Sequence, residues 1–188
     1  MALKVKPTIR YLKDLKDVIY DQKWHKETRN FPVYYMYRGI KKRGGWRYDI
    51  TIIPPNMLGE EYTKTQGHRH IGAYNEAYSV LSGKAIFFLQ KIVKGKVFDA
   101  YVVEAKKGEG VVIPSNYGHI TINPANYPLK LANWIKDKSR SSYEFIGKKR
   151  GGCYYYLESG WMKNKHYGQT PSLRFEKPIK KIPLSFFS

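Results

Sequence analysis

The stretch Thr65-Gln66-Gly67-His68-Arg69-His70, followed after five further residues by Glu76, decides how this sequence is interpreted. On a β-strand, residues i and i+2 point to the same face, so the imidazoles of His68 and His70 converge on one side of a sheet. Alone, a His-x-His pair is weak evidence, because two surface histidines on an edge strand give the same pattern. Its weight depends on what surrounds it.

A third histidine strengthens the hypothesis of a metal site. His119 stands far along the chain, just past Pro114, at the head of a later run of strand-forming residues. Three imidazoles and one carboxylate leave one or two positions open for water or substrate, and mixed nitrogen and oxygen ligation suits Fe²⁺, Mn²⁺, Ni²⁺ or Zn²⁺. We therefore predict one divalent ion per chain, with Fe²⁺ as first choice, on His68, His70, Glu76 and His119.

The pattern of strand-forming residues and turns in the rest of the sequence is typical of an all-β protein. Short strand-forming runs alternate with glycine turns, which is typical of an antiparallel sandwich or barrel. We expect strands at 33–37, 46–53, 76–81, 84–92, 96–104, 110–113, 119–122 and 129–135. Residues 8–19 have apolar side chains at helical spacing and predict a short helix or turn. Residues 141–162 predict one or two more strands, and the Lys- and Pro-rich segment 163–183 is expected to be irregular.

Composition narrows the classes of function. A single cysteine, Cys153, excludes an internal disulfide framework and suits a reducing compartment. No secretory apolar region follows Met1, because Lys4, Lys6 and Pro7 interrupt it, and the apolar runs are too short for a bilayer. We expect a cytoplasmic protein without a membrane partner. The formal net charge of +19 favours anionic partners, but the basic residues are scattered, so a solvated cationic surface is preferred to nucleic-acid binding.

Two spaced motifs make the chain resemble the cupin superfamily. The first comprises His68, His70, Glu76 and Gly83, and the second comprises Gly108, Pro114, His119 and Asn123. The gap between His70 and Glu76 is longer than usual, and Asn116 replaces a glycine, although asparagine tolerates a left-handed backbone. The resemblance implies an all-β cupin (jelly-roll) double-stranded β-helix barrel with a short N-terminal helix and extra C-terminal strands. We expect a single domain over 1–188, with its barrel core at about 32–146, an N-terminal extension at 1–31 and a basic C-terminal extension at 147–188.

Within the cupins, the sequence is similar to the archaeal cupin-type glucose-6-phosphate isomerases. The family pattern is matched by Thr65-x-Gly67-His68-x-His70, Glu76-x-Tyr78 and Leu81-x-Gly83, although Ala85 replaces a final glycine. The similarity extends from Arg10 to about Tyr143, roughly two thirds of the chain.

This resemblance implies a metal-dependent isomerase of glycolysis and gluconeogenesis that interconverts glucose 6-phosphate and fructose 6-phosphate, working as a homodimer. It assigns the substrate phosphate to Thr51, Thr65 and Gly67. It assigns further substrate contacts to Tyr34, Tyr78 and Tyr143, and catalysis to Glu76 and Tyr78. Glu76 is ligand, base or both in turn, because an enediol route and a direct hydride shift stay equally open. One more family tyrosine falls at Trp134 or Ile135 and is not reproduced.

Two other classes of function remain open. The chain could be another metallo-cupin enzyme, either a sugar-phosphate isomerase of different specificity or an Fe²⁺ dioxygenase. It could also be a non-catalytic sugar-binding cupin with a nucleic-acid-binding tail. The Thr-x-Gly before His68 favours the isomerase over the dioxygenase. Without the family pattern, simple β-propensity would be the preferred explanation of Thr51 and Thr65, and Tyr78 could equally be a barrel-lining aromatic.

Overall fold

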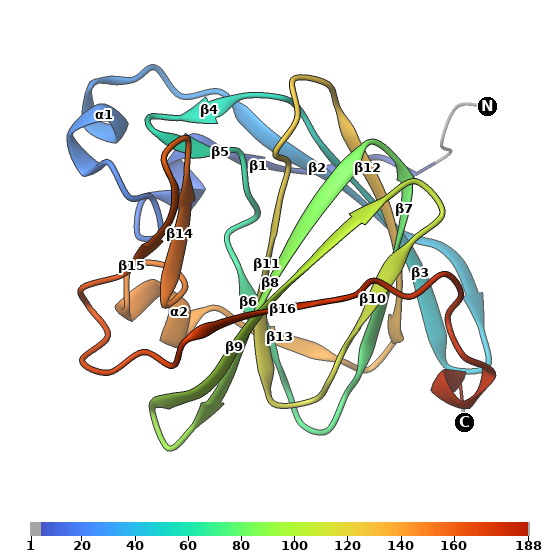
Figure 1. Ribbon diagram of the computed structural model, residues 1–188. Helices are drawn as coiled ribbons and strands as arrows, with labels where there is room; N and C mark the ends of the chain where they lie inside the picture. The colour runs from blue at the N-terminus through green and yellow to red at the C-terminus, as the bar shows by residue number, and fades with distance from the viewer. Residues whose placement is uncertain (1–4, 188) are drawn as a thin grey trace.

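Two six-stranded sheets face each other and close into a barrel in the computed structural model, which describes residues 5–187 (Figure 1). The first sheet has the order β1 (Thr8–Tyr11), β2 (Pro32–Arg43), β3 (Trp46–Ile53), β12 (Leu129–Lys136), β7 (Glu76–Ser82), β10 (Gly110–Ile113). The second has the order β13 (Arg140–Ser142), β6 (His68–Ile71), β11 (Tyr117–Ile122), β8 (Lys84–Val93), β9 (Lys96–Lys106), β16 (Leu173–Glu176). The all-β barrel of two facing sheets that the sequence predicts is confirmed.

Smaller elements surround the barrel. A third sheet has the order β15 (Gly160–Lys163), β14 (Tyr154–Leu157), β5 (Glu61–Tyr62), β4 (Met57–Leu58). The helical segments are η1 (Leu12–Leu15), α1 (Gln22–Glu27), α2 (Glu144–Lys148) and η2 (Leu184–Phe187). None of the helices in residues 5–187 has the length and apolar character that a bilayer crossing requires. The outermost residues of the two expected extensions, 1–4 and 188, including Lys4, lie outside the described residues.

The N-terminal segment contains the short helix or turn expected within 8–19, but over fewer residues. Residues Thr8–Tyr11 form β1, which pairs antiparallel with the edge of β2, and only Leu12–Leu15 make a short helical turn. The helical spacing had a different cause, because Leu12, Leu15, Val18 and Ile19 are all buried as the segment covers the barrel. The helix lies farther along, where the carboxylate of Asp21 accepts from the backbone N–H of Trp24 and caps α1.

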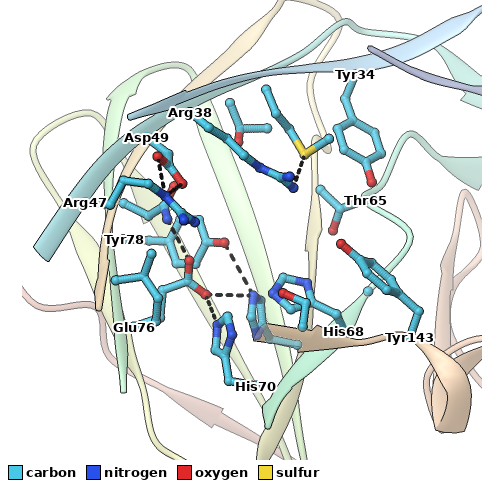
Figure 2. Close-up of a pocket in the computed structure, with 17 residues that line it drawn as sticks. Tyr34, Arg38, Arg47, Asp49, Thr65, His68, His70, Glu76, Tyr78 and Tyr143 are labelled. Carbon is cyan, nitrogen blue, oxygen red and sulfur yellow. Dashed lines mark hydrogen bonds and ion pairs between the residues drawn. The ribbon is translucent and has the colours of Figure 1, made fainter. Parts of the chain in front are cut away.

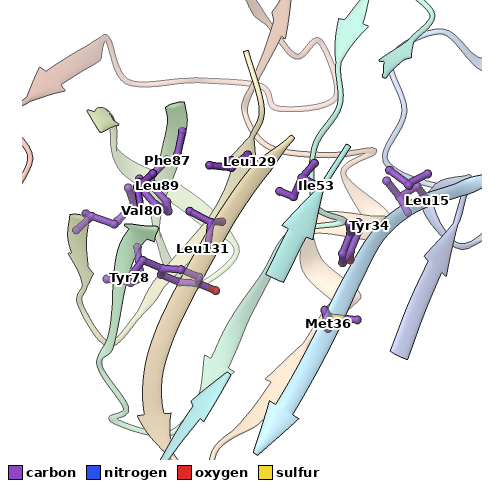
Figure 3. Close-up of a cluster of buried hydrophobic side chains, with 14 of the residues drawn as sticks. Leu15, Tyr34, Met36, Ile53, Tyr78, Val80, Phe87, Leu89, Leu129 and Leu131 are labelled. Carbon is purple, nitrogen blue, oxygen red and sulfur yellow. The ribbon is translucent and has the colours of Figure 1, made fainter. Parts of the chain in front are cut away.

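The central strand β8 is apolar on both faces because both faces are covered. Phe87 and Leu89 point into the core between the two large sheets (Figure 3), whereas Ile86 and Phe88 belong to a second core outside the barrel. Tyr154 of β14 is part of that second core. The small sheet therefore closes the outer face of the second sheet. Of the one or two further strands predicted within 141–162, both are present, as β14 and β15.

The last part of the chain forms a strap across the barrel. Residues 173–176, expected to be irregular, form β16 and pair in parallel with β9. An antiparallel bridge then joins Ile179 to Gly110, and the ring of Phe186 lies 4.6 Å from that of Trp46. Figure 1 shows this segment in red, crossing from the second sheet to the first. Backbone pairing, which side-chain pattern does not reveal, orders this Lys- and Pro-rich stretch.

A buried ion pair ties the N-terminal segment to the wall of the barrel. The ammonium of Lys64 donates to the carboxylate of Glu61 and, at 2.7 Å, to the carbonyl of Val18. The backbone N–H of Tyr20 donates to the other carboxylate oxygen of Glu61 at 2.7 Å. Only 5% of the Lys64 side chain and 1% of the Glu61 side chain are exposed, so each charge depends on the other.

Replacing Lys64 with methionine is expected to lower the free energy of unfolding by about 3–5 kcal/mol, because the Glu61 carboxylate loses its cation in a buried place. Urea denaturation measures the difference. The exposed pair Lys148–Glu144 provides the control, and Lys148→Met should have a much smaller effect. Equal losses in the two variants would show that the buried pair does not anchor the segment.

Candidate metal centre

Two neighbouring strands of the second sheet bring the three histidines together. His68 and His70 lie on β6, and His119 on β11 is the direct cross-strand neighbour of His68. The ring centroids of His68 and His119 are 4.4 Å apart, and those of His68 and His70 are 4.9 Å apart. The alternation of strand side chains therefore places His68 and His70 on one face, as the His-x-His pattern predicts.

Glu76, the first residue of β7, reaches the histidines from the opposite sheet (Figure 2). Its Oε2 lies 2.8 Å from Nε2 of His70 and 3.3 Å from Nε2 of His119. Its Oε1 accepts from the side-chain amide of Asn133 at 2.7 Å. The Tyr78 hydroxyl lies 3.4 Å from Nε2 of His119. A carboxylate and imidazoles thus converge on one point between the sheets.

The surroundings of these groups give them the protonation states that a metal requires. Burial lowers the pKa of His119 to about 4 and that of His68 well below its ordinary value, so both imidazoles are neutral near pH 7. Burial alone would raise the pKa of Glu76, but the hydrogen bond from His70 and the neighbouring imidazoles outweigh it and lower the pKa to about 2. Burial and the Glu76 charge raise the pKa of Tyr78, which stays a neutral hydroxyl.

This donor set fits a divalent ion. One ligand atom from each of His68, Glu76 and His119 lies within 4.8 Å of the others, and His70 contacts Glu76 directly. Neutral imidazoles and an ionised carboxylate are the forms that bind metals. The Nδ1 atoms of His70 and His119 are buried and lack a hydrogen-bond partner within 5–187. His68, Glu76 and His119 form a cluster that could hold the ion, and His70, which contacts Glu76, lies beside that cluster.

The substrate residues implied by the resemblance line the same pocket as the four metal candidates. They come from five different parts of the chain: Tyr34, Thr51, Thr65, Gly67, Tyr78 and Tyr143. Gly67 has φ of +79°, and a Cβ there would lie 2.6 Å from the side chain of Ile120, so only glycine fits. The pocket thus joins the metal candidates to a patch of hydroxyl groups (Figure 2).

Five polar side chains in the pocket were missed by the sequence interpretation: Arg38, Arg47, Asp49, Asn133 and Ser141. Strand alternation could have found them, since Arg47 and Asp49 precede Thr51 by four and two residues on β3. Strand pairing places Asn133 of β12 between Asp49 of β3 and Tyr78 of β7. Two residues farther along β12, Ile135 lies between Arg47 and Glu76 in the same way.

The two candidates for the missing family tyrosine have different positions. Ile135 lines the pocket, whereas the ring of Trp134 packs against that of Tyr48 at 4.9 Å. The pocket therefore has an apolar side chain, Ile135, between its strand partners Arg47 and Glu76.

Comparison with known proteins gives a consistent picture. The model of the family described as glucose-6-phosphate isomerase (GPI) matches residues 9–172. The glucose-6-phosphate isomerase of Thermococcus litoralis is 31% identical over 129 residues, covering 65% of this chain and 66% of the relative. The Pyrococcus furiosus isomerase is 29% identical over the same shares. Among solved structures, Bacillus subtilis oxalate decarboxylase is 19% identical with a TM-score of 0.45. The match covers 58% of this chain and 26% of the decarboxylase chain.

The family model covers most of the chain and includes every metal candidate, from His68 to His119. The alignment to the curated relatives leaves about a third of each relative unmatched. The match is to the archaeal cupin-type enzymes, in agreement with the motifs around His68 and Glu76. The chain belongs to the glucose-6-phosphate isomerase family in its archaeal, cupin-type form.

Proposed function

We propose that this protein interconverts glucose 6-phosphate and fructose 6-phosphate at a divalent metal centre held by His68, His70, Glu76 and His119. The observation that carries the proposal is the single pocket in which these four side chains meet the hydroxyl-bearing residues Thr51, Thr65, Tyr34, Tyr78 and Tyr143. Such a pocket offers one end for a sugar's oxygen atoms and another for its phosphate. Family membership supports the same conclusion.

A bound divalent ion would supply Lewis acidity towards the C1 and C2 oxygens of the sugar. Glu76 is the one carboxylate among the metal candidates, and Asn133 fixes its orientation through Oε1. In an enediol route, Glu76 takes the proton from one carbon and returns it to the neighbouring carbon. The neutral hydroxyl of Tyr78, next to His119, donates a hydrogen bond to the sugar oxygen on which charge develops.

The phosphate end of the substrate is assigned to Thr51, Thr65 and Gly67. The Oγ1 of Thr65 accepts from the backbone N–H of Thr121 at 3.0 Å, which leaves its own proton free for a phosphate oxygen. Glycine at 67 lets the backbone approach an anion closely. The Tyr34 hydroxyl accepts from the N–H of Gln66 at 3.4 Å and so faces the same end.

Replacing Thr51 and Thr65 together with valine is expected to raise KM for fructose 6-phosphate roughly 10-fold or more, because two hydrogen bonds to a charged group are lost. The kcat should change far less, since the hydroxyls lie at the non-reacting end. Steady-state kinetics measures both constants. Thr8→Val, on an exposed part of β1, is the matched control. An unchanged KM would contradict the assignment.

A coupled assay tests the function itself. Fructose 6-phosphate is added to the metal-loaded protein, and the glucose 6-phosphate formed is followed by an NADP-dependent dehydrogenase. Turnover with this substrate supports the proposal. Turnover only with another sugar phosphate would assign a different specificity, and oxygen consumption without isomerisation would assign a dioxygenase.

Five further properties are part of the proposal. Fe²⁺ is our first choice of ion, and the mixed nitrogen and oxygen donor set also suits Mn²⁺, Ni²⁺ or Zn²⁺. Family resemblance favours a homodimer, which sedimentation analysis would test, and a cytoplasmic role in glycolysis and gluconeogenesis. We place residues 1–188 in a single domain, since β16 and η2 both pack on the barrel. Nucleic acid is not required as a partner.

A further inference from the structure

We propose that Arg38 is the cation that recognises the anionic group of the substrate, a role that rests on the proposed function. A phosphate dianion needs a positive charge as well as the neutral donors of Thr51, Thr65 and Gly67. Arg38 lies on β2 and lines the pocket together with those residues. Figure 2 shows its side chain extending over the pocket from the β2 side, towards Tyr34 and Thr65.

The guanidinium of Arg38 is available for a ligand. Its one hydrogen bond within the described chain joins Nη2 to the thioether sulfur of Met36 at 3.3 Å, and a thioether is a weak acceptor. No carboxylate lies within salt-bridge distance of Arg38 in residues 5–187. Five N–H donors in a fixed fork are thus almost unused, and this fork matches the oxygens of a phosphate.

The second arginine of the pocket shows the opposite arrangement. Nε of Arg47 donates to both carboxylate oxygens of Asp49, each at 2.9 Å, and a second carboxylate, that of Asp137, lies 3.8 Å from its Nη1. Arg47 is therefore neutralised by the protein itself. Arg38 and Arg47 both line this pocket, but only Arg38 has its charge uncompensated.

A β-bulge next to Arg38 helps to set its direction. The pairing of β2 with β3 shifts register between Tyr37 and Lys41, so that Arg38, Gly39 and Ile40 face a single residue of β3, Asp49. Gly39 has φ of +69°, and its backbone N–H donates to Asp49 Oδ1 at 2.7 Å. Bulges beside functional sites commonly redirect side chains. The same carboxylate that neutralises Arg47 therefore also fixes the backbone beside Arg38.

The charge of Arg38 acts on the groups of the phosphate end. Burial raises the pKa of Tyr34 to about 12, and the positive charges of Arg10 and Arg38 act against that rise. Tyr34 lines the same pocket as Thr65, so the charge of Arg38 acts at the end of the pocket that carries these hydroxyl groups.

The test compares Arg38→Met, Arg38→Lys and Arg43→Met in the metal-loaded protein. Arg43 lies on the same strand, is exposed and does not line the pocket, so it controls for loss of a surface charge. We expect Arg38→Met to raise KM for fructose 6-phosphate roughly 10–100-fold with kcat largely kept, because a charge-assisted contact to the non-reacting end is lost. Lysine keeps the charge without the fork and should restore part of the affinity.

A binding measurement separates this inference from the proposed function. Inorganic phosphate is titrated against the metal-loaded wild type and each variant, followed by ³¹P NMR, and Arg38→Met should weaken its binding while Arg43→Met should not. If the wild type lacks isomerase activity but shows this pattern, the function fails and the anion site stands. If the wild type isomerises and Arg38→Met leaves KM and phosphate binding unchanged, Arg38 has no such role. Thermal denaturation confirms that the variants are folded, since Arg38 has no carboxylate to leave unpaired.

Discussion

Removing the metal with a chelator is expected to abolish isomerase activity, and Fe²⁺, Mn²⁺ or Ni²⁺ should restore it. The reason is the donor set: ligand atoms of His68, Glu76 and His119 lie within 4.8 Å of one another, and His70, the proposed fourth ligand, contacts Glu76. Without the ion, no cation is left to polarise the sugar oxygens at this point. Metal content by elemental analysis and turnover should fall together. Full turnover in a verified metal-free sample would refute the metal-dependent mechanism.

Single-ligand variants give the matched comparison for that experiment. His68→Ala and His119→Ala should each lose metal. Changing a residue that supports a ligand weakens metal affinity by about 10–100-fold, and we expect a larger loss of affinity when a ligand itself is removed. His166→Ala is the control, because it removes a histidine outside the pocket. A variant that keeps full occupancy without His119 would remove that residue from the ligand set.

The second large effect is expected from Glu76→Gln, which separates metal binding from chemistry. Glutamine keeps the shape and a neutral oxygen ligand but loses the charge and the basicity. If Glu76 is the base, the variant should hold substantial metal through its three histidines and lose roughly 10²–10⁴ in kcat. If Glu76 is only a ligand, activity should follow metal occupancy and recover with excess metal. Occupancy and kcat are measured on the same samples.

Hydrogen exchange with solvent distinguishes the two routes independently. A proton held by Glu76 during an enediol step can exchange with water, so deuterium should enter the product in heavy water. A direct hydride shift carries hydrogen between the carbons without exchange. Asn133→Ala is a useful companion, because it leaves the carboxylate in place but removes its 2.7 Å hydrogen bond. Exchange in the wild type together with an inactive Glu76→Gln variant supports the base.

The part of the site that could be predicted from sequence consists of residues that lie two apart on the same strand. Spacing by two placed His68 with His70, and Glu76 with Tyr78, on common faces. Asn116 has φ of +71°, the left-handed backbone expected for the residue that replaces a motif glycine. The glycine turns at Gly83, Gly95 and Gly108 likewise have positive φ.

What the sequence could not reveal depends on contacts between distant strands. Asp49 faces Asn133 only because β3 pairs with β12, and no local pattern encodes that neighbour. The bulge beside Arg38 is a register shift between two strands, so it has no signature in either strand alone. The error at residues 8–11 has the same origin, since their hydrogen-bonding partner in β2 decides between helix and strand.

The parallel pairing of β16 with β9 also has a consequence for how the protein is made. On a ribosome, β9 (Lys96–Lys106) emerges long before β16 (Leu173–Glu176). One edge of β9 pairs with β8, and within the described chain the other edge pairs with no strand but β16. An unpaired strand edge is a template for pairing with other chains. During synthesis, this edge of β9 therefore keeps a row of free N–H and C=O groups until every other strand of the two large sheets has been translated. The nascent chain is most exposed to wrong pairing in that interval, and the strap brings it to an end.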